Sequence, residues 1–544
     1  MTVPAGGTTS VQVTSNTDHD GPDGVYAGRI TATDGENTVV SAIGMIKEKE
    51  SYDLTVSNLG LDGQPIEAAA SIVGVDVDYL LDTYQATTKV RLLKGDYLVD
   101  GHQFVGSDVY SLVQPSVSLT RNTTVVLDAR KAKPVRITVP NAEASLAIAD
   151  VGYERRSANG EHTVTATVAF DHSRQVYSAQ FGASLPPEQL TGHVSSQWGR
   201  MNADQSYDGS PYLYVQLDSM PGSYPTGFRR DVAADQLAVV DQQFNATSDR
   251  TVERAVSGVP AGGGDTWAIS IPFRAAAAAR VLVAAGNASW LTRFDEREPE
   301  QNPHPELPLD HELVSRPRTY QAGRTYQERY NAVVLAPSPV TASRAGDRLK
   351  LAVAPLSDAD GNKGFGPWDL QSSKLIQDGT VIADGPVFGD IEVAGLPAAK
   401  TTFTLQAAQT RQPHSTFSTR TEYSWTFSSA GTAEPVTLPM LAVRYRPTVD
   451  RSNLAERRPV TALPVIVDTV PGRALPTVVK VRLQVSGDDG KTWREASVEP
   501  TGSGAYQAVF STPKDASTIS LKAHLVDAEG NSTDQTVIAA YPLR

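Results

Sequence analysis

Residues 162–170 read HTVTATVAF, and this stretch decides the fold class of the chain. Apolar side chains occupy every second position, and threonines occupy most of the positions between them. Such alternation is typical of an antiparallel strand with one buried and one solvated face. The pattern recurs in VKVRLQV at 479–485 and in three shorter runs, LKLAV near Leu349, TFTLQA near Phe403 and YSWTF from Tyr423. The sequence therefore predicts an all-β protein.

Two segments alone have the spacing of a helix. They are DVAADQLAVVDQQF, from Asp231, and RAAAAARVLVAAG, from Arg274, and the second suits a strand of small residues equally well.

The composition is that of a multidomain globular protein. The 544 residues are 40% hydrophobic and 20% charged, too apolar in their runs for disorder and enough for roughly three to five domains. The net charge of −13 is spread along the chain, which argues against nucleic acid or an anionic membrane as a partner. With no cysteine, disulfides and thiolate sites are excluded. The opening MTVPAGGTTS lacks the features of a signal peptide, and no apolar run approaches the ~18 residues of a membrane span.

Turn and linker signals divide the chain into tandem blocks. Residues 51–133, with SYDLTVSNL and TTKVRLLKGDYLVDG, suit a small sandwich of the transthyretin-like or carboxypeptidase-regulatory type. Residues 134–447 form a long, irregular β-rich central region of one or two domains. The charged and proline-bounded residues 448–459 are a predicted linker. Residues 460–544 then have the size of an immunoglobulin-like sandwich.

Residues 1–50 supply only the closing strands of a sandwich. VPAGGTTSVQV, GVYAGRITATDG and NTVVSAIGMIK are predicted as three short strands between Gly, Asp, Asn and Pro turns. Three strands with one apolar face rarely close a sandwich, because the covering sheet is missing. Either the next block completes this domain or its opening strands lie outside the chain. In the second case we expect exposed apolar sheet near Val11, Val13 and Ile30.

The sharpest short motif is SGDDGKTW at 486–493, which matches the Asp-box pattern S-x-D-x-G-x-T-W. We expect a hairpin in which Asp488 accepts from turn amides, Gly490 takes a positive φ and Trp493 packs on the strands. Such motifs recur in sialidases and other secreted β proteins, usually away from the catalytic centre. A structural role is predicted.

Two segments, SDADGNKG at 357–364 and VDAEGNST at 526–533, have the look of calcium loops. In the first, Asp358, Asp360 and Asn362 offer oxygens at alternate positions, as a hard cation requires, and are candidate calcium ligands. The glutamate expected at the twelfth position is absent. An Asx-Gly turn between strands is therefore the favoured interpretation of both segments, with a calcium site as the alternative. No other cofactor is predicted.

Histidine and aromatic residues give two further candidate sites. His304 and His311 lie with acidic residues in EREPEQNPHPELPLDHE, but no HExxH or HxH spacing occurs, which favours a solvated acidic loop over a metal site. SYDGSPYLYV holds Tyr207, Tyr212 and Tyr214, which are candidate sugar-stacking residues. Packing within the sheets is the more common role of such aromatics.

Motifs for nucleophilic and phosphate chemistry are missing. The chain has no GxSxG nucleophile turn and no glycine-rich phosphate loop. A pair of catalytic carboxylates cannot be selected from 61 acidic residues by sequence.

The order of segments nevertheless resembles a known family. VPAGGTTSVQV, GPDGVYAGRITATDG and VVSAIGMIKEKESYDLTV, then LTRNTTVVLDARKAKPVRITVP and the closing SGDDGKTW and VDAEGNSTDQTVIAAYPLR, are similar to the C-terminal extension of large secreted subtilisin-like serine peptidases of actinomycetes. The resemblance covers essentially the whole chain. It implies that residues 1–50 belong to a fibronectin-III-like sandwich that follows a peptidase core, and that the parent protein is an extracellular serine endopeptidase.

The catalytic signatures of that family do not occur in these residues. No histidine is followed by glycine, and DTG, DSG and GTS are all absent. No residue here can therefore be assigned a catalytic role by the resemblance.

The sequence predicts a non-catalytic accessory region that spaces or stabilises a peptidase or binds its substrate or a surface. Its expected partner is the peptidase domain, in cis or as a separate chain, with protein substrate or cell-surface glycan as further partners. The first alternative is a stand-alone extracellular protein that binds glycans or proteins. The second is a hydrolase with an unrecognised site within residues 134–447, where we would expect convergent carboxylates or a His–Ser pair.

Overall fold

The structure is a computed structural model. It describes residues 3, 6–17, 19–246, 251–261, 263–274, 276–297, 309–352, 356–366, 370–385, 390–412, 415–470 and 472–544.

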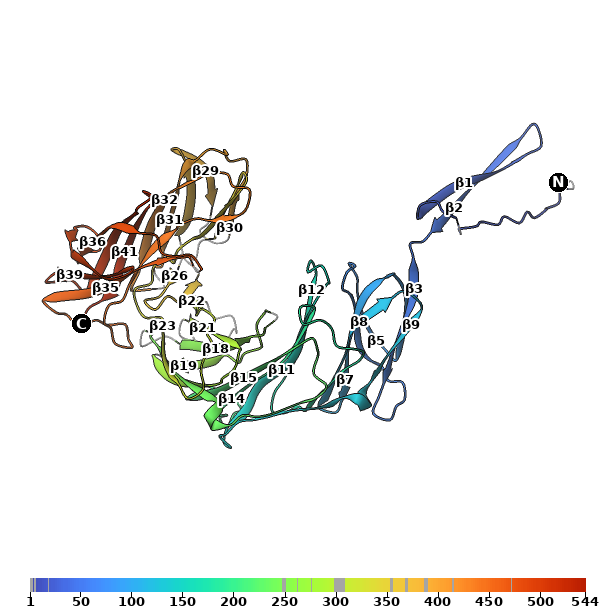
Figure 1. The fold of residues 1–544 in the computed structure, drawn as a ribbon, viewed down its shortest axis with the longest axis horizontal. Helices are drawn as coiled ribbons and strands as arrows, with labels where there is room; N and C mark the ends of the chain where they lie inside the picture. Colours follow the sequence, from blue (N-terminus) through green and yellow to red (C-terminus); the bar gives the residue numbers. More distant parts are fainter. Residues whose placement is uncertain are drawn as a thin grey trace.

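The described chain is all-β, as predicted. Its helical elements are two short 3-10 turns, η1 (Ala129–Lys131) and η2 (Ala234–Gln236). No helix in the described part of the chain is long and apolar enough to cross a membrane. The sheets follow one another along an open arc, with a hairpin projecting at the N-terminal end and the C-terminal strands at the other end (Figure 1). The segment from Asp231, a helix candidate by its spacing, forms η2 and a strand instead, because tertiary pairing overrides its local preference.

The N-terminal hairpin is a sheet of its own, made of β1 (Gly24–Thr33) and β2 (Thr38–Lys47). All ten residues of β1 pair with β2. The predicted strand in VPAGGTTSVQV differs, since residues 7–17 are assigned to no strand. Val11, Val13 and Ile30 are exposed, but only Ile30 lies in a strand, so the exposed sheet expected here is limited to the hairpin.

A first sandwich follows the hairpin. Its smaller sheet has the order β6 (Thr87–Leu93), β3 (Ser51–Leu59), β9 (Thr123–Asp128). Its larger sheet has the order β16 (Phe228–Asp231), β10 (Lys133–Thr138), β13 (Val176–Gln180), β8 (Asp108–Leu119), β7 (Gly95–Val105), β4 (Ala68–Gly74), β5 (Leu80–Gln85). Leu54 and Leu127 of the smaller sheet share a core with Ile72 and Leu112 of the larger one.

The larger sheet of this sandwich is buried on both faces. On its second face Leu98 and Val113 share a core with Val151 and Val194 of the next sheet. That sheet has the order β12 (Thr163–Phe170), β11 (Ser145–Arg156), β14 (Leu190–Gly199), β15 (Tyr212–Pro221), β20 (Ala277–Ala284), β17 (Leu237–Phe244), β23 (Thr325–Tyr330). The first two sandwiches therefore share a layer.

The central sheet continues this arrangement. It has the order β19 (Ile271–Arg274), β18 (Thr251–Val259), β21 (Ser289–Arg297), β22 (Leu309–Val314), β27 (Lys363–Phe365), β26 (Leu356–Ser357). Its Val252 and Phe294 lie in the largest core, together with Val240 of β17 and with Leu463 and Leu521 of the C-terminal strands.

One broad sheet spans the C-terminal part of the chain. It has the order β29 (Thr380–Gly385), β28 (Leu370–Gln377), β31 (Thr401–Thr410), β32 (Arg420–Ser429), β41 (Ser532–Pro542), β40 (Thr518–Asp527), β36 (Val478–Ser486), β37 (Arg494–Glu495). Two smaller sheets cover its inner face. They are β30 (Asp390–Val393), β25 (Arg348–Ala352), β24 (Thr341–Ala345), β33 (Val436–Thr437), and β34 (Leu441–Tyr445), β35 (Val460–Thr469), β39 (Ala505–Ser511), β38 (Ser497–Gly502).

Strand pairing crosses two of the three expected domain boundaries. At residue 133, β10 pairs with β13 and, in parallel, with β16, so the first sandwich draws strands from the predicted central region. Near the predicted linker at 448–459, β32 pairs with β41 over seven residues. Asn453 within that linker is fully buried and bonds to Asn245 and Asn331. Its charges and prolines predicted an exposed connection, but buried side-chain hydrogen bonds fix this segment in the core.

Candidate functional site

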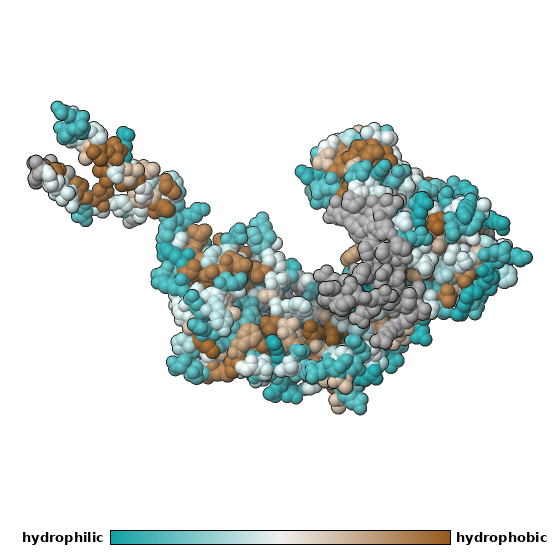
Figure 2. All heavy atoms as spheres, turned by 180° about the vertical axis from the view of Figure 1, so that it is seen from behind, coloured by the Kyte–Doolittle hydropathy of each residue, from teal (hydrophilic) through white to brown (hydrophobic). Residues whose placement is uncertain are grey.

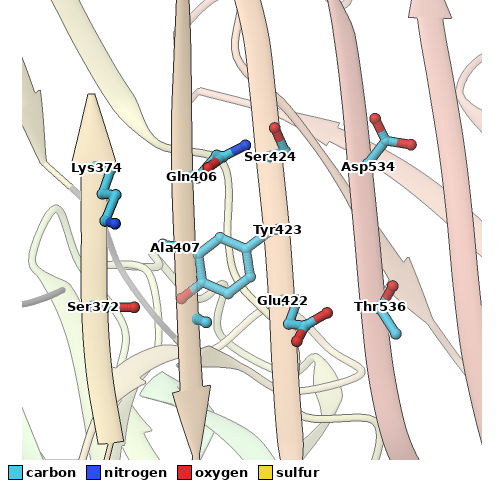
Figure 3. A pocket seen from close by; sticks show the side chains of 10 residues that line it. Ser372, Lys374, Gln406, Ala407, Glu422, Tyr423, Ser424, Asp534 and Thr536 are labelled. Atoms are coloured by element: carbon cyan, nitrogen blue, oxygen red, sulfur yellow. The ribbon is translucent and has the colours of Figure 1, made fainter. Parts of the chain in front are cut away.

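The outer face of the eight-stranded sheet carries polar side chains in register across six strands. Strands β28, β31, β32, β41, β40 and β36 lie side by side, and residues at alternate positions point away from the two cores. Figure 3 shows the first four of these strands, with polar side chains projecting from them. The period of two that builds the core therefore also builds this surface.

Two neighbouring rows of residues make up this surface, which we call the polar face. The first row is Lys374, Gln406, Ser424, Asp534, His524 and Arg482, each paired in register with the next. The second row is Ser372, Ala408, Glu422, Thr536, Lys522 and Gln484. Five strand spacings of ~4.8 Å give each row a length of about 24 Å. A shallow hollow of ≈ 440 Å³ lies over the β28, β31, β32 and β41 part of the face.

Charges on the polar face are paired locally. His524 Nδ1 lies 2.9 Å from Asp534 Oδ1 on the neighbouring strand. Glu422 is paired with Arg420 two residues away on the same strand. Lys374 and Gln406 are exposed and open to solvent. The face therefore carries both donors and acceptors, which suits a ligand with many hydroxyl groups, since each hydroxyl both donates and accepts. The two rows contain no phenylalanine, tyrosine or tryptophan, so contact with them would rest mainly on hydrogen bonds.

The tyrosine candidates do not form one stacking platform. Tyr207 is buried in the largest core, and its hydroxyl donates to Leu146 O at 2.9 Å. Tyr212 and Tyr214 are half-buried, and their rings meet edge to face at 5.8 Å. Burial raises the pKa of Tyr214. Tyr207 is therefore corrected to a core residue, because its short loop folds back onto the start of β11.

The calcium candidates are engaged as turn residues. Asp358 is fully buried, and its carboxylate accepts from the main-chain N–H groups of Asn331, Asp360 and Asn362 and from Asn362 Nδ2, at 2.8–3.0 Å. Asp360 is paired with Arg329 and, at 2.6 Å, with Arg446 Nη2. Within the described residues no group of three or more His, Asp or Glu side chains is arranged to hold a metal ion. The geometry is that of the Asx-Gly turn.

His311 is a buried residue and not part of a solvated loop. Its Nε2 lies 2.8 Å from Asn331 Oδ1, and its Nδ1 lies 3.5 Å from Glu296 Oε2 and 3.3 Å from Arg411 Nη2. Strand pairing of β22 with β21 carries it inward. His304, the other histidine of the sequence motif, falls outside the described residues.

The structure contains a buried Asp–His–Ser group that the sequence did not predict. Asp150 of β11 is fully buried, accepts from Ser195 Oγ at 2.8 Å and lies 3.1 Å from His193 Nε2. It also accepts from Trp267 N at 2.9 Å. In a hydrolytic triad the histidine stands between the other two residues, whereas here the aspartate does. This geometry gives Ser195 no base. The one available signal was the i, i+2 spacing of His193 and Ser195 on a strand.

The Asp-box hairpin has the predicted geometry. Asp488 accepts from Ser486 Oγ at 2.6 Å, Thr492 Oγ1 at 2.6 Å and Thr492 N at 2.9 Å, and these hydrogen bonds hold its pKa below the usual range. Gly490 has φ +81°, and a side chain there would meet Ile538 and Trp493. The hydrogen bonds of Asp488 thus all lie within the motif's own turn, as expected for a structural role.

Comparisons with known proteins add little. No family model matches the chain, and no curated protein matches it. Among solved structures it is similar to the N-terminal four Ig domains of Dscam1 isoform 6.44, with 8% identity over 76% of this chain and 97% of that chain and a TM-score of 0.12. At that TM-score the similarity carries no argument, and the all-β class rests on the strands described above.

Proposed function

We propose that this chain is the non-catalytic accessory region of a secreted subtilisin-like serine peptidase. The resemblance of its β segments to the extensions of that family suggests the assignment. The observation that supports it is the exposure of the N-terminal hairpin. Val25 is 77% exposed, Ile46 71% and Val39 69%. Figure 2 shows hydrophobic residues along most of this projecting element.

Both faces of the hairpin carry these apolar side chains. Val25 and Ile46 are cross-strand partners on one face, and the partners Ala32 and Val39 lie on the other. An isolated two-stranded hairpin is at best marginally stable in water, and a third strand or a packed face is what stabilises it. The hairpin therefore suits a place beneath another β-sheet. We propose that the peptidase domain, or the sandwich joined to it, supplies that sheet, in cis or as a separate chain.

The first experiment is to read the DNA upstream of the codon for Met1. Segments encoding H-G-T and G-T-S-[MA], in the same frame or one frameshift away, are the expected result. An unrelated gene or a clean promoter at that place would contradict the peptidase assignment.

The second experiment tests the hairpin itself. The catalytic region encoded upstream is mixed with this chain, and complex formation is followed by size-exclusion chromatography with light scattering. Val39→Lys together with Ile46→Lys should abolish the complex, because these residues lie on opposite faces and the double substitution places a charge on whichever face the partner sheet covers. Val381→Lys is the matched control, since Val381 is 49% exposed on β29. A complex that survives the double substitution would refute the role of the hairpin.

The polar face favours a second candidate function, the binding of an extended glycan. Two in-register rows of donors and acceptors suit a hydroxyl-rich polymer lying across the strands. Affinity electrophoresis in gels that contain single polysaccharides should retard the chain. Gln406→Ala with Asp534→Ala should remove the retardation, whereas Lys350→Ala, an exposed residue of β25, should leave it unchanged. If no polysaccharide retards the chain, this candidate fails.

A further inference from the structure

A second hollow lies where four separate parts of the chain meet. It has a volume of ≈ 310 Å³. Its walls come from β17, from β23 with the segment before it, from the loop at 358–362 and from the residue just after β34. The lining side chains are Gln243, Arg318, Gln327, Glu328, Arg329, Tyr330, Asp360, Asn362 and Arg446. We call this hollow the arginine pocket.

The loop at 358–362 is a rigid wall of the arginine pocket. Asp358 is buried beneath it and fixes the main chain on both sides of Asp360. Asp360 Oδ2 accepts from Arg329 Nε at 2.7 Å, and its Oδ1 accepts from Arg446 Nη2 at 2.6 Å. One carboxylate therefore sets the positions of two guanidinium groups before any ligand arrives.

The opposite wall is held by Glu328. This residue is buried, and its Oε1 accepts from Tyr320 Oη at 2.6 Å and from Arg318 Nη1 at 3.3 Å. Its Oε2 accepts from Tyr330 Oη at 2.8 Å and from Gln242 Nε2 at 3.2 Å. Four donors satisfy this carboxylate, so it orients Arg318 and is itself fully occupied.

The pocket has a surplus of positive charge and of hydrogen-bond donors. Three arginines and two carboxylates line it, which leaves one positive charge in excess. In the described part of the chain, Arg318, Arg329 and Arg446 each donate through a single side-chain nitrogen. A guanidinium group has five N–H donors, so most remain available to a ligand. Planar carboxylates are the groups that arginine binds best in a two-point manner.

Neutral acceptors stand beside the arginines. Gln243 donates through Nε2 to Asn245 Oδ1 at 3.0 Å, and Gln327 donates through Nε2 to Asp241 Oδ2 at 3.1 Å. Both leave their Oε1 atoms as acceptors for the hydroxyl groups of a ligand. A bare anion such as phosphate or acetate would use the arginines but not these amides.

We propose that the arginine pocket binds a hexuronic acid, with the sugar carboxylate on Arg318 and Arg446 and its hydroxyl groups on Gln243 and Gln327. This site goes beyond the proposed function, because it lies on β23 and the loop at 358–362, elements that neither the hairpin nor the polar face uses. A single acidic sugar residue suits a hollow of this size, and longer uronic-acid polymers would present such a residue at one end.

The test is isothermal titration calorimetry of the full chain with glucuronate and galacturonate. We expect one of them to bind with a millimolar or lower Kd and glucose not to bind. Arg446→Ala should weaken binding about tenfold or more, as expected for the loss of a charge-assisted contact. Arg318→Ala should do the same, and it leaves the clamp on Asp360 intact. Arg348→Ala is the matched control, because Arg348 is also an exposed arginine paired with a glutamate, on another sheet.

Further variants distinguish this site from simple anion binding. Asp360→Asn should strengthen hexuronate binding a fewfold, because it raises the excess positive charge and keeps an amide oxygen that can still hold one of the two arginines. Raising the salt concentration from about 0.05 M to about 0.5 M should weaken binding. The proposal is overturned if neither uronate binds, if Arg318→Ala and Arg446→Ala bind as well as the native chain, or if acetate, phosphate or a tetraglutamate peptide binds as tightly as the uronate. These outcomes are independent of the upstream DNA and of the polar face.

Discussion

The loops at 357–364 and 526–533 have the same turn in two different surroundings. Asp358 and Asp527 are both buried. Each accepts from the main-chain N–H groups two and four residues later and from the side chain of the following asparagine, Asn362 or Asn531. The motif Asp-Ala-acid-Gly-Asn thus builds one fixed geometry twice.

The two loops differ in the second acidic residue of this motif. Asp360 lies in the arginine pocket and pairs with two arginines, whereas Glu529 at the matching position is exposed. Asp358 also accepts from Asn331 N, a contact that Asp527 does not have among its hydrogen bonds in the described chain. The two turns therefore share one hydrogen-bond pattern and differ in what surrounds the second acidic residue.

Removing the first aspartate should have the largest effect in both loops. Asp358→Ala leaves four N–H donors without an acceptor, and Asp527→Ala leaves three. We expect each loop to lose about 2–4 kcal/mol of local stability, with the greater loss at Asp358. Native-state hydrogen exchange at Asn362 N and Asn531 N measures both. A greater loss at Asp527 would contradict the comparison.

The next effect is a pH dependence of the first loop. Burial raises the pKa of Asp358 from 3.8 to about 6. The carboxyl group of Asp358 therefore binds a proton more tightly in the folded loop than in the unfolded chain. The stability that this protonated group contributes to the loop is fully present below about pH 4. It is lost as the pH rises to about 6, a change of about 2–3 kcal/mol. Hydrogen exchange, corrected for intrinsic rates, should show this decrease in the native chain but not in Asp358→Asn.

Alanine at the glycine of each turn should cost less, and equally in both. Gly361 and Gly530 both have φ +85°, in the left-handed region that disfavours a side chain. An added Cβ would find no close atom at Gly530 and only an ordinary contact with Arg444 at Gly361. We expect about 1–2 kcal/mol for each substitution. Hydrogen exchange of the two loops checks the equality, and a difference larger than about 1 kcal/mol would show that the turns are not alike.

Neutralising the second acid should have the smallest effect and should separate the loops. Asp360→Asn loses ion pairs with two arginines and should cost about 0.5–1.5 kcal/mol of local stability. Glu529→Gln, at an exposed position, should change the stability by less than about 0.5 kcal/mol. Thermal unfolding followed by exchange at the same amides measures both. An equal cost would mean that the arginines do not support the first loop.

Local sequence signals predicted the strands but not their partners. Alternation over HTVTATVAF gave β12, and SGDDGKTW gave its hairpin, because both depend on residues close in sequence. The parallel pairing of β3 with β9 and of β8 with β13 joins strands that are far apart in the sequence, and neither strand's sequence indicates its partner. Tyr207 illustrates the same limit, since its burial depends on a distant strand.

The arginine pocket could not be predicted for the same reason. Arg318 and Arg446 are separated by more than a hundred residues, and Asp360 stands between them in a loop that looked like a calcium site. Their convergence follows from the packing of β23, β27 and β34, which no local pattern records. The polar face could be predicted in part. The alternation shows which residues of each strand point outward, but the rows across strands require the strand order, which the sequence does not show.

In the eight-stranded sheet, two neighbouring strands are synthesised at different times. β32 ends at Ser429 and its neighbour β41 begins at Ser532, so 102 residues lie between them. At ~5–20 residues per second, a ribosome leaves that side of β32 without its partner for about 5–20 s. During this interval the strand offers an open ladder to any other extended chain. The eleven residues of β41 thus complete a sheet whose first strands are made much earlier. A nascent chain halted before β41 would therefore be more prone to aggregate than the complete chain.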